Sequence, residues 1–220
     1  MFQIQSLKNE TTGHIILLMN KRDDKQQLIL EAGLEEILLK GFNGTSVKDI
    51  TVAANIPKGS FYNYFESKEH FGLEALHYVS STSCENARLT LSCQQLPPLE
   101  RLAKFYQDGA LELEASNFEK GCLLGNLGQE LSDANPVFQE TVEKLMGKMT
   151  SQLEMCLLEA IEQGELNANI CPKMMAEFLF NAWEGTITRM KTSKSKRPFT
   201  VFQNALRVLF GKADQEPCPN

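Results

Sequence analysis

Residues 57–72, PKGSFYNYFESKEHFG, decide the fold. Four aromatic residues occupy five positions of this stretch, and a lysine stands close by on either side. The segment is too short and too polar to cross a membrane. A tyrosine ring can pack against protein while its hydroxyl meets a polar partner, so the composition favours a short helix with one buried and one exposed side. The residues concerned are Lys58, Phe61, Tyr62, Tyr64, Phe65 and Lys68.

An amphipathic helix is expected ahead of this stretch, over residues 25–42, with Gly41 at its end. Apolar residues recur there every four positions, and charged residues take the opposite side. The stripe consists of Leu30, Leu34, Leu38 and Phe42.

A second helix of about two turns should follow, capped by Thr45 or Ser46. Asp49 stands three residues after Ser46, which is the capping-box position. Asn55 tolerates the left-handed conformation of a tight turn, and Pro57 suits the first turn of a third helix. The spacing therefore predicts two short helices joined by a tight turn.

Ser67 can cap a fourth helix, which completes a helix-turn-helix pattern packed against longer helices. In such units the second short helix enters the major groove of DNA with its first residues. A small surface allows close approach to the bases, and a lysine can reach a guanine edge or a phosphate. Those first residues are Lys58, Gly59 and Ser60.

The next residues suit a DNA backbone. Tyr62 and Tyr64 can pack a ring and extend a hydroxyl to a phosphate, and Asn63 carries both a donor and an acceptor. Lys68 adds positive charge near a helix N-terminus. The alternative is that the aromatic run only fixes a short helix to its neighbours, and we adopt that interpretation for the phenylalanines alone, Phe61 and Phe65.

The rest of the chain shows helical periodicity and no alternating strand pattern. In the segment 136–165 one apolar face contains Phe138, Val142, Leu145, Met149, Leu153, Cys156 and Ala160. Two later segments, 172–190 and 199–210, are apolar on more than one side, so each should bury a second face against another subunit. We predict an all-α protein with a disordered leader (1–22), a helix-turn-helix domain (23–68), a second helical domain (69–212) and a tail (213–220).

Composition limits the function classes. The 220 residues carry a formal net charge of −6, which argues against a general polyanion binder but not against one locally basic face. Six cysteines without a CxxC pair are typical of thiols in a reducing cytoplasm. His70, His77 and Cys84 recur every seven residues, yet each step spans roughly 10 Å, too far for one metal ion. We therefore expect neither a metal nor a cofactor.

The segment GFNGTSVKDITVAANIPKGSFYNYFESKEHF, residues 41–71, resembles the N-terminal signature of the TetR/AcrR family of bacterial transcriptional regulators. The resemblance implies an all-helical homodimer that binds palindromic operator DNA through its three-helix N-terminal domain. It also implies a C-terminal helical bundle that binds a small inducer and supplies the dimer interface. Two residues depart from the family pattern: Asn55 replaces the usual turn glycine, and Thr51 the usual alanine. Ile50, Phe61 and Phe65 would be core, and the DNA-facing positions would be Thr45, Lys48, Lys58, Gly59, Ser60, Tyr62, Tyr64 and Lys68.

A second likeness concerns residues 121–133, GCLLGNLGQELSD, which resemble a branch of electrophile- and aldehyde-responsive repressors. Cys122 should stand near a helix N-terminus, where the helix dipole could lower the thiol pKa and favour a sensing role. The alternative is a small buried residue in a glycine-rich helix contact. Candidates to line an inducer cavity, each also typical of plain core, are Phe105, Phe138, Met149, Phe178 and Trp183, with Tyr106, Phe118 and Met146.

We predict a cytoplasmic, dimeric, ligand-responsive DNA-binding regulator, a repressor and not an enzyme. A small molecule or a thiol-reactive inducer would release it from its operator. Activation in place of repression is compatible with the same residues. Two other classes remain: a thiol-dependent enzyme using Cys122, near which the sequence has no histidine, and a helical scaffold that does not bind DNA.

Overall fold

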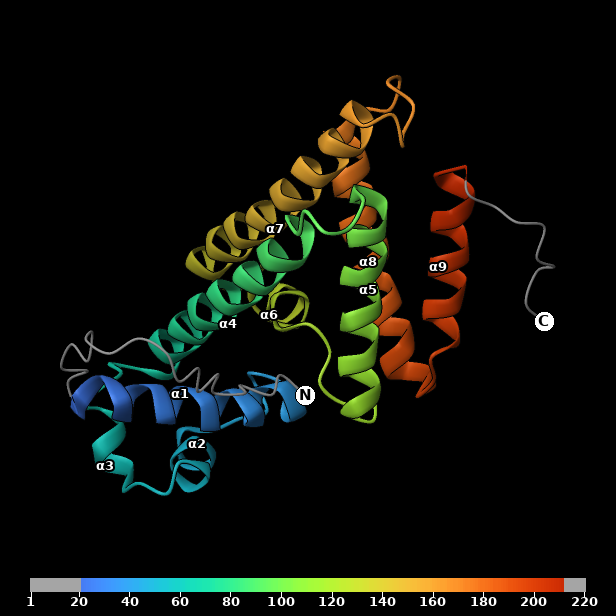
Figure 1. Cartoon of the computed structure of the whole chain (residues 1–220). Coiled ribbons are helices and arrows are strands. Elements are labelled where there is room, and N and C mark those ends of the chain that lie inside the picture. The colour runs from blue at the N-terminus through green and yellow to red at the C-terminus, as the bar shows by residue number, and fades with distance from the viewer. Residues whose placement is uncertain (1–20, 212–220) are drawn as a thin grey trace. The chain divides into compact units, whose positions relative to one another are not determined.

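The computed structural model describes residues 21–211, and within that range the chain is helical without any strand (Figure 1). The all-α prediction is confirmed. Among the helices described, none combines the length and the apolar content needed to cross a bilayer. The helices are α1 (Lys21–Lys40), α2 (Val47–Ala53), α3 (Lys58–Phe61), α4 (Lys68–Leu91), α5 (Pro98–Ala115), α6 (Leu123–Leu131), α7 (Pro136–Glu162), α8 (Pro172–Ser193) and α9 (Arg197–Leu209).

The first helix differs at its start from the expectation. α1 begins at Lys21, four residues before the predicted start, because its first turn carries no apolar residue that periodicity could detect. It stops before Gly41, which adopts φ +78°, as expected of a residue that ends a helix. The predicted leader falls mainly on residues 1–20, which lie outside the described residues, as does the predicted tail.

Two compact units divide the chain, with the boundary between Ala75 and Leu76 inside α4. In the first unit α1 packs on α2, and α2 packs on α3. Gly33 of α1 allows this closeness, since a Cβ there would lie 2.5 Å from Phe71 Cζ and 2.8 Å from Ile50 Cγ2. Any larger residue would push α1 away from both side chains.

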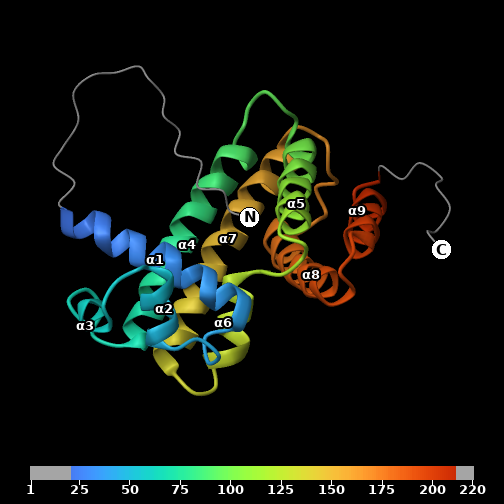
Figure 2. The ribbon, with the colours of Figure 1, turned by 90° about the horizontal axis from the view of Figure 1, so that it is seen from below.

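The second unit is built around α7, which packs against α5, α6 and α8, while α9 packs on α8 (Figures 1 and 2). The predicted apolar face of α7 is confirmed, because all seven of its residues are buried. Aromatic rings fill the space between α5, α8 and α9. Their centroids lie 5.3 Å apart for Tyr106 and Trp183, and 4.8 Å apart for Tyr106 and Phe202.

An ion pair between a buried arginine and a partly exposed glutamate connects three segments of the second unit. Arg101 of α5 has only 1% of its surface exposed, and its guanidinium donates to both carboxylate oxygens of Glu159 in α7, at 2.7 and 2.9 Å. It also donates to the carbonyl oxygens of Leu91 at 3.2 Å and Leu96 at 2.7 Å. Arg101 therefore satisfies the end of α4 and the α4–α5 connection from inside the core.

Candidate nucleic-acid interface

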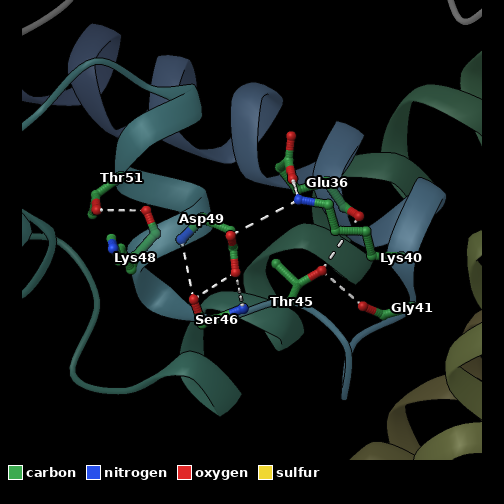
Figure 3. Close-up of polar contacts among 8 residues, drawn as sticks. All are labelled: Glu36, Lys40, Gly41, Thr45, Ser46, Lys48, Asp49 and Thr51. Atoms are coloured by element: carbon green, nitrogen blue, oxygen red, sulfur yellow. Dashed lines mark hydrogen bonds and ion pairs between the residues drawn. The ribbon is translucent and has the colours of Figure 1, made fainter.

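The start of α2 is fixed by a reciprocal cap (Figure 3). The Ser46 hydroxyl accepts from the Asp49 amide at 3.2 Å, and the Ser46 amide donates to Asp49 Oδ2 at 2.8 Å. Donation from the Ser46 hydroxyl to Asp49 Oδ2 at 2.5 Å, and then from the Ser46 amide, holds the pKa of Asp49 below its ordinary value more than the nearby lysines do. The predicted capping box is confirmed, with Ser46 and not Thr45 as the cap.

Charged side chains connect the end of α1 to this cap. The Lys40 ammonium is paired with Glu36 one turn earlier and lies 3.9 Å from Asp49 Oδ1 (Figure 3). Because Asp49 belongs to the capping box, this contact helps to set where α2 begins relative to α1.

The expectation that Thr45 faces DNA is wrong for its side chain. The residue is 1% exposed, and its hydroxyl donates to the carbonyl oxygens of Gly41 at 2.8 Å and Glu36 at 3.3 Å (Figure 3). Thr45 thus closes the end of α1 from within. Thr51, the departure from the family pattern, is also buried, and its hydroxyl donates to the Lys48 carbonyl at 3.0 Å, so it leaves no unmet polar group.

The turn between α2 and α3 takes the conformation that its residues favour. Asn55 adopts φ +51°, and the Ile56 amide donates to the Thr51 carbonyl at 2.9 Å. Pro57 then precedes the single turn of α3. The Ser67 hydroxyl caps α4 by accepting from the His70 amide at 3.1 Å, as predicted.

The phenylalanines of α3 and the α3–α4 connection form the core of this unit. Phe61 and Phe65 have no exposed surface, and their ring centroids lie 5.2 Å apart. Phe71 of α4 completes the cluster, at 5.8 Å from Phe61 and 5.0 Å from Phe65. The prediction that these two phenylalanines are core is confirmed, and so is that for Ile50.

The other candidate residues leave an accessible surface on α3 and around it. Tyr62 is 52% exposed, although its ring meets Phe61 edge-on at 5.4 Å. A Cβ at Gly59 would meet nothing within 4 Å, so this part of α3 is open to close approach. The Lys68 ammonium lies 4.4 Å from the centroid of the Phe42 ring. Lys48, Lys58, Gly59 and Asn63 are exposed, while Ser60, Tyr64 and Lys68 are half-buried.

The candidates for an inducer site in the second unit do not form one set. Met149 and Trp183 belong to its main core, and Phe105 packs against that core. Phe138 is fully buried near the start of α7. The expectation that Phe178 lines a cavity is wrong, because this residue is 51% exposed on α8. It lies one turn after the exposed Met174, on a side of α8 that turns away from the core.

Cys122 is the N-cap of α6, as the sequence indicated. The expected lowering of its pKa is wrong. Burial of the sulfur raises the pKa of the Cys122 thiol well above its ordinary value, and the Glu184 carboxyl beside it adds to the effect. The amides of Gly125 and Leu124 act in the opposite direction, as the helix-dipole argument supposed, but they are outweighed. Burial also raises the pKa of Glu184.

Sequence reasoning missed Arg101, Glu159 and Glu184, whose roles depend on contacts between helices far apart in sequence. No local signal marks them, because a charged residue in a polar-rich helix normally faces solvent. Across residues 21–211 no group of three or more metal-ligating side chains comes together.

A capped two-turn helix, a left-handed turn and an accessible second helix on a phenylalanine core define a helix-turn-helix regulator. Residues 29–75 match the family model described as bacterial regulatory proteins, tetR family, and residues 98–206 match the tetracyclin repressor-like C-terminal domain. The chain belongs to the TetR family, and it is a DNA-binding transcriptional regulator.

The similarity to named relatives extends over most of their length. The chain is 34% identical to the HTH-type transcriptional repressor DhaR of Mycobacterium sp., over 86% of this chain and 92% of that protein. It is 31% identical to the HTH-type transcriptional repressor NemR of Escherichia coli, over 86% and 94%. The crystal structure of a TetR regulatory protein from Rhodobacter sphaeroides superimposes with a TM-score of 0.78 at 31% identity, covering 86% and 97% of the two chains.

Proposed function

We propose that the protein is a ligand-responsive repressor that binds a palindromic operator as a homodimer. The main support is that the aromatic run divides into two sets. Phe61 and Phe65 are buried, whereas the residues around Lys58, Gly59 and Tyr62 are accessible. The packed pair gives α3 a rigid base, and the accessible set has the small, basic and phenolic groups that suit a major groove. Repression is supported by the similarity to DhaR and NemR, both named as repressors.

Selection of bound DNA from a random pool tests this proposal. We expect the full chain to enrich a palindrome whose half-sites are about one helical turn apart or a multiple of that spacing. Enrichment of no sequence, or of an asymmetric one, would count against it. Placing the selected operator inside a promoter then distinguishes repression from activation.

Removal of the Lys58 charge should weaken binding to all sequences similarly. If the Lys58 ammonium neutralises one phosphate, Lys58→Ala should make the slope of log affinity against log salt shallower by about one. Lys148→Ala, an equal change of charge at an exposed position of α7, is the matched control and should keep the original slope. Salt titrations by fluorescence anisotropy provide the measurement. Equal slopes for Lys58→Ala and the unaltered chain would remove Lys58 from the interface.

The proposed dimer interface uses apolar side chains on α8 and α9. Met174 and Phe178 on α8, and Val201 and Val208 on α9, each have half or more of their surface exposed. The four lie at helical spacing within their helices, and α8 packs on α9. A Cβ at Gly185 would also meet nothing within 4 Å, which leaves room for a second backbone. Large apolar residues grouped in this way are typical of subunit contacts.

Phe178→Glu should therefore dissociate the dimer. A carboxylate in the centre of an apolar interface loses its hydration, and we expect dissociation to be favoured by at least about a hundredfold. Met155→Glu on α7, where the replaced side chain is 63% exposed, should leave the dimer intact. Sedimentation velocity across a dilution series distinguishes the two. A dimer that survives Phe178→Glu would place the interface elsewhere.

Release from DNA needs only a modest preference of the inducer for the DNA-incompetent state. A coupling of about 1–3 kcal/mol changes affinity by about 5- to 150-fold. α4 contains the boundary between the units, so we propose that it carries the change. The raised pKa of Cys122 favours a noncovalent inducer over a thiol-reactive one. It also disfavours a thiol-dependent enzyme.

A further inference from the structure

Among residues 21–211, the buried side-chain oxygen atoms without a hydrogen-bond partner include two in the second unit. They are the hydroxyl of Tyr106 on α5 and the side-chain oxygen Oε1 of Gln152 on α7. Tyr106 is only 1% exposed. An unpaired buried polar atom is costly, so such atoms usually have a partner that is not part of the chain, either a water molecule or a ligand.

The orientation of the Gln152 amide follows from its neighbour. Its nitrogen Nε2 donates to the carbonyl oxygen of Cys84 in α4 at 3.0 Å. A flipped amide would set two acceptors against each other, so the nitrogen belongs there and the oxygen is the atom left over. The Gln152 side-chain oxygen therefore needs a hydrogen-bond donor.

Tyr106 of α5 lies near the same part of α7 that contains Gln152. The Tyr106 hydroxyl interacts electrostatically with the thiol of Cys156, which lies one turn after Gln152 on the same side of α7. Cys156 is itself occupied, because its thiol donates to the Pro98 carbonyl at 3.3 Å. Both unpaired atoms therefore belong to the part of the second unit where α5 packs on α7 and Gln152 reaches α4.

The walls of this region are aromatic and apolar. Tyr106 packs against Phe105, Trp183 and Phe202, with ring centroids 4.8 to 5.3 Å apart. Met146 and Cys84 are half-buried at the edge of the same core, and an unbranched methionine side chain can move aside at low cost. Burial raises the pKa of Tyr106, so the hydroxyl keeps its proton and can donate.

We infer that the inducer is an uncharged molecule with an aromatic or apolar body and one hydroxyl group, anchored by Tyr106 and Gln152. The ligand hydroxyl accepts from Tyr106 and donates to Gln152, which meets both unpaired atoms with one group. An anionic ligand would lose its hydration among these rings, and Arg101, the cation that acts on Cys156, is already paired with Glu159. The inference rests on the proposed function, because it assigns the chemical class of the proposed inducer.

Benzyl alcohol, toluene and benzoate are suitable probes, since they share a ring and differ in the polar group. Trp183 is the only tryptophan in the sequence, and its ring lies 5.3 Å from that of Tyr106, so its fluorescence reports on this region. We expect saturable binding of benzyl alcohol to the full-length dimer, about tenfold tighter than that of toluene, and no binding of benzoate.

Tyr106→Phe removes only the hydroxyl. We expect it to bind benzyl alcohol no better than toluene, with toluene affinity unchanged, and to unfold at the same temperature as the parent or a higher one. Tyr78→Phe, the same change on α4, should keep the preference for the alcohol. Absence of alcohol binding, equal affinity for alcohol and toluene, or an unaffected preference in Tyr106→Phe would each overturn the inference.

Operator binding is measured separately on the same proteins, so the two ideas can fail independently. Loss of the alcohol preference in Tyr106→Phe alongside normal operator binding supports the inference. If the chain binds benzyl alcohol at Tyr106 but enriches no palindrome, the proposed function is contradicted. The ligand site is still supported in that case.

Discussion

Phe61→Ala is expected to lower the free energy of unfolding of the N-terminal unit by about 3–5 kcal/mol. Phe61 has no exposed surface and contacts the rings of Phe65 and Phe71. Removing its ring leaves a cavity where three phenylalanines met, and α3 is a single turn with little hydrogen bonding of its own to compensate. Urea titration followed by circular dichroism should show an early transition for the helices of this unit.

Tyr62→Phe is the matched change on the neighbouring residue. Because Tyr62 is 52% exposed, loss of its hydroxyl should change stability by no more than about 0.5 kcal/mol. Operator affinity should fall, since the hydroxyl is the group proposed to reach a phosphate. Similar effects of the two substitutions on stability would contradict the assignment of opposite sides to Phe61 and Tyr62.

Local chemistry explains which parts of the fold could be predicted from the sequence. The Ser46–Asp49 capping box, the left-handed Asn55 and the Ser67 cap each depend on residues within four positions of one another. The periodic apolar face of α7 requires only that a helix bury one side. Such short-range features can be predicted from the sequence because they do not depend on residues far away in the chain.

The predictions that were wrong concern side chains whose environment is determined by residues distant in sequence or by unexpected contacts. Thr45 is a plausible surface residue until the carbonyl oxygens of Glu36 and Gly41 come close enough to accept its hydroxyl. Cys122 does stand at a helix N-terminus, yet burial and Glu184, 62 positions away in the sequence, determine the direction of its pKa. An aromatic residue such as Phe178 looks the same in sequence whether it fills a core or an interface.

Arg101→Met should lower the free energy of unfolding of the second unit by about 2–3 kcal/mol, mainly through the hydrogen bonds that it removes. Methionine can fill much of the space of the arginine stem, so the loss is mainly electrostatic. The carbonyl oxygens of Leu91 and Leu96 lose their donor, and the Glu159 carboxylate loses a bidentate partner. Lys104→Met, which breaks an exposed pair with Asp108 on the same helix, should cost no more than about 0.5 kcal/mol.

The pH dependence of stability distinguishes the contribution of the Arg101–Glu159 ion pair from that of side-chain packing. Hydrogen bonds from Arg101 are the main cause that holds the pKa of Glu159 below its ordinary value. A carboxyl whose folded pKa is depressed stabilises the fold above its unfolded pKa of about 4.3, and this contribution is lost as pH falls through the folded pKa. The difference in stability between the parent and Arg101→Met should therefore be full at pH 7 and shrink below about pH 4. If the difference stays constant across that range in urea titrations, the effect of Arg101 comes from packing and the carbonyl bonds, not from Glu159.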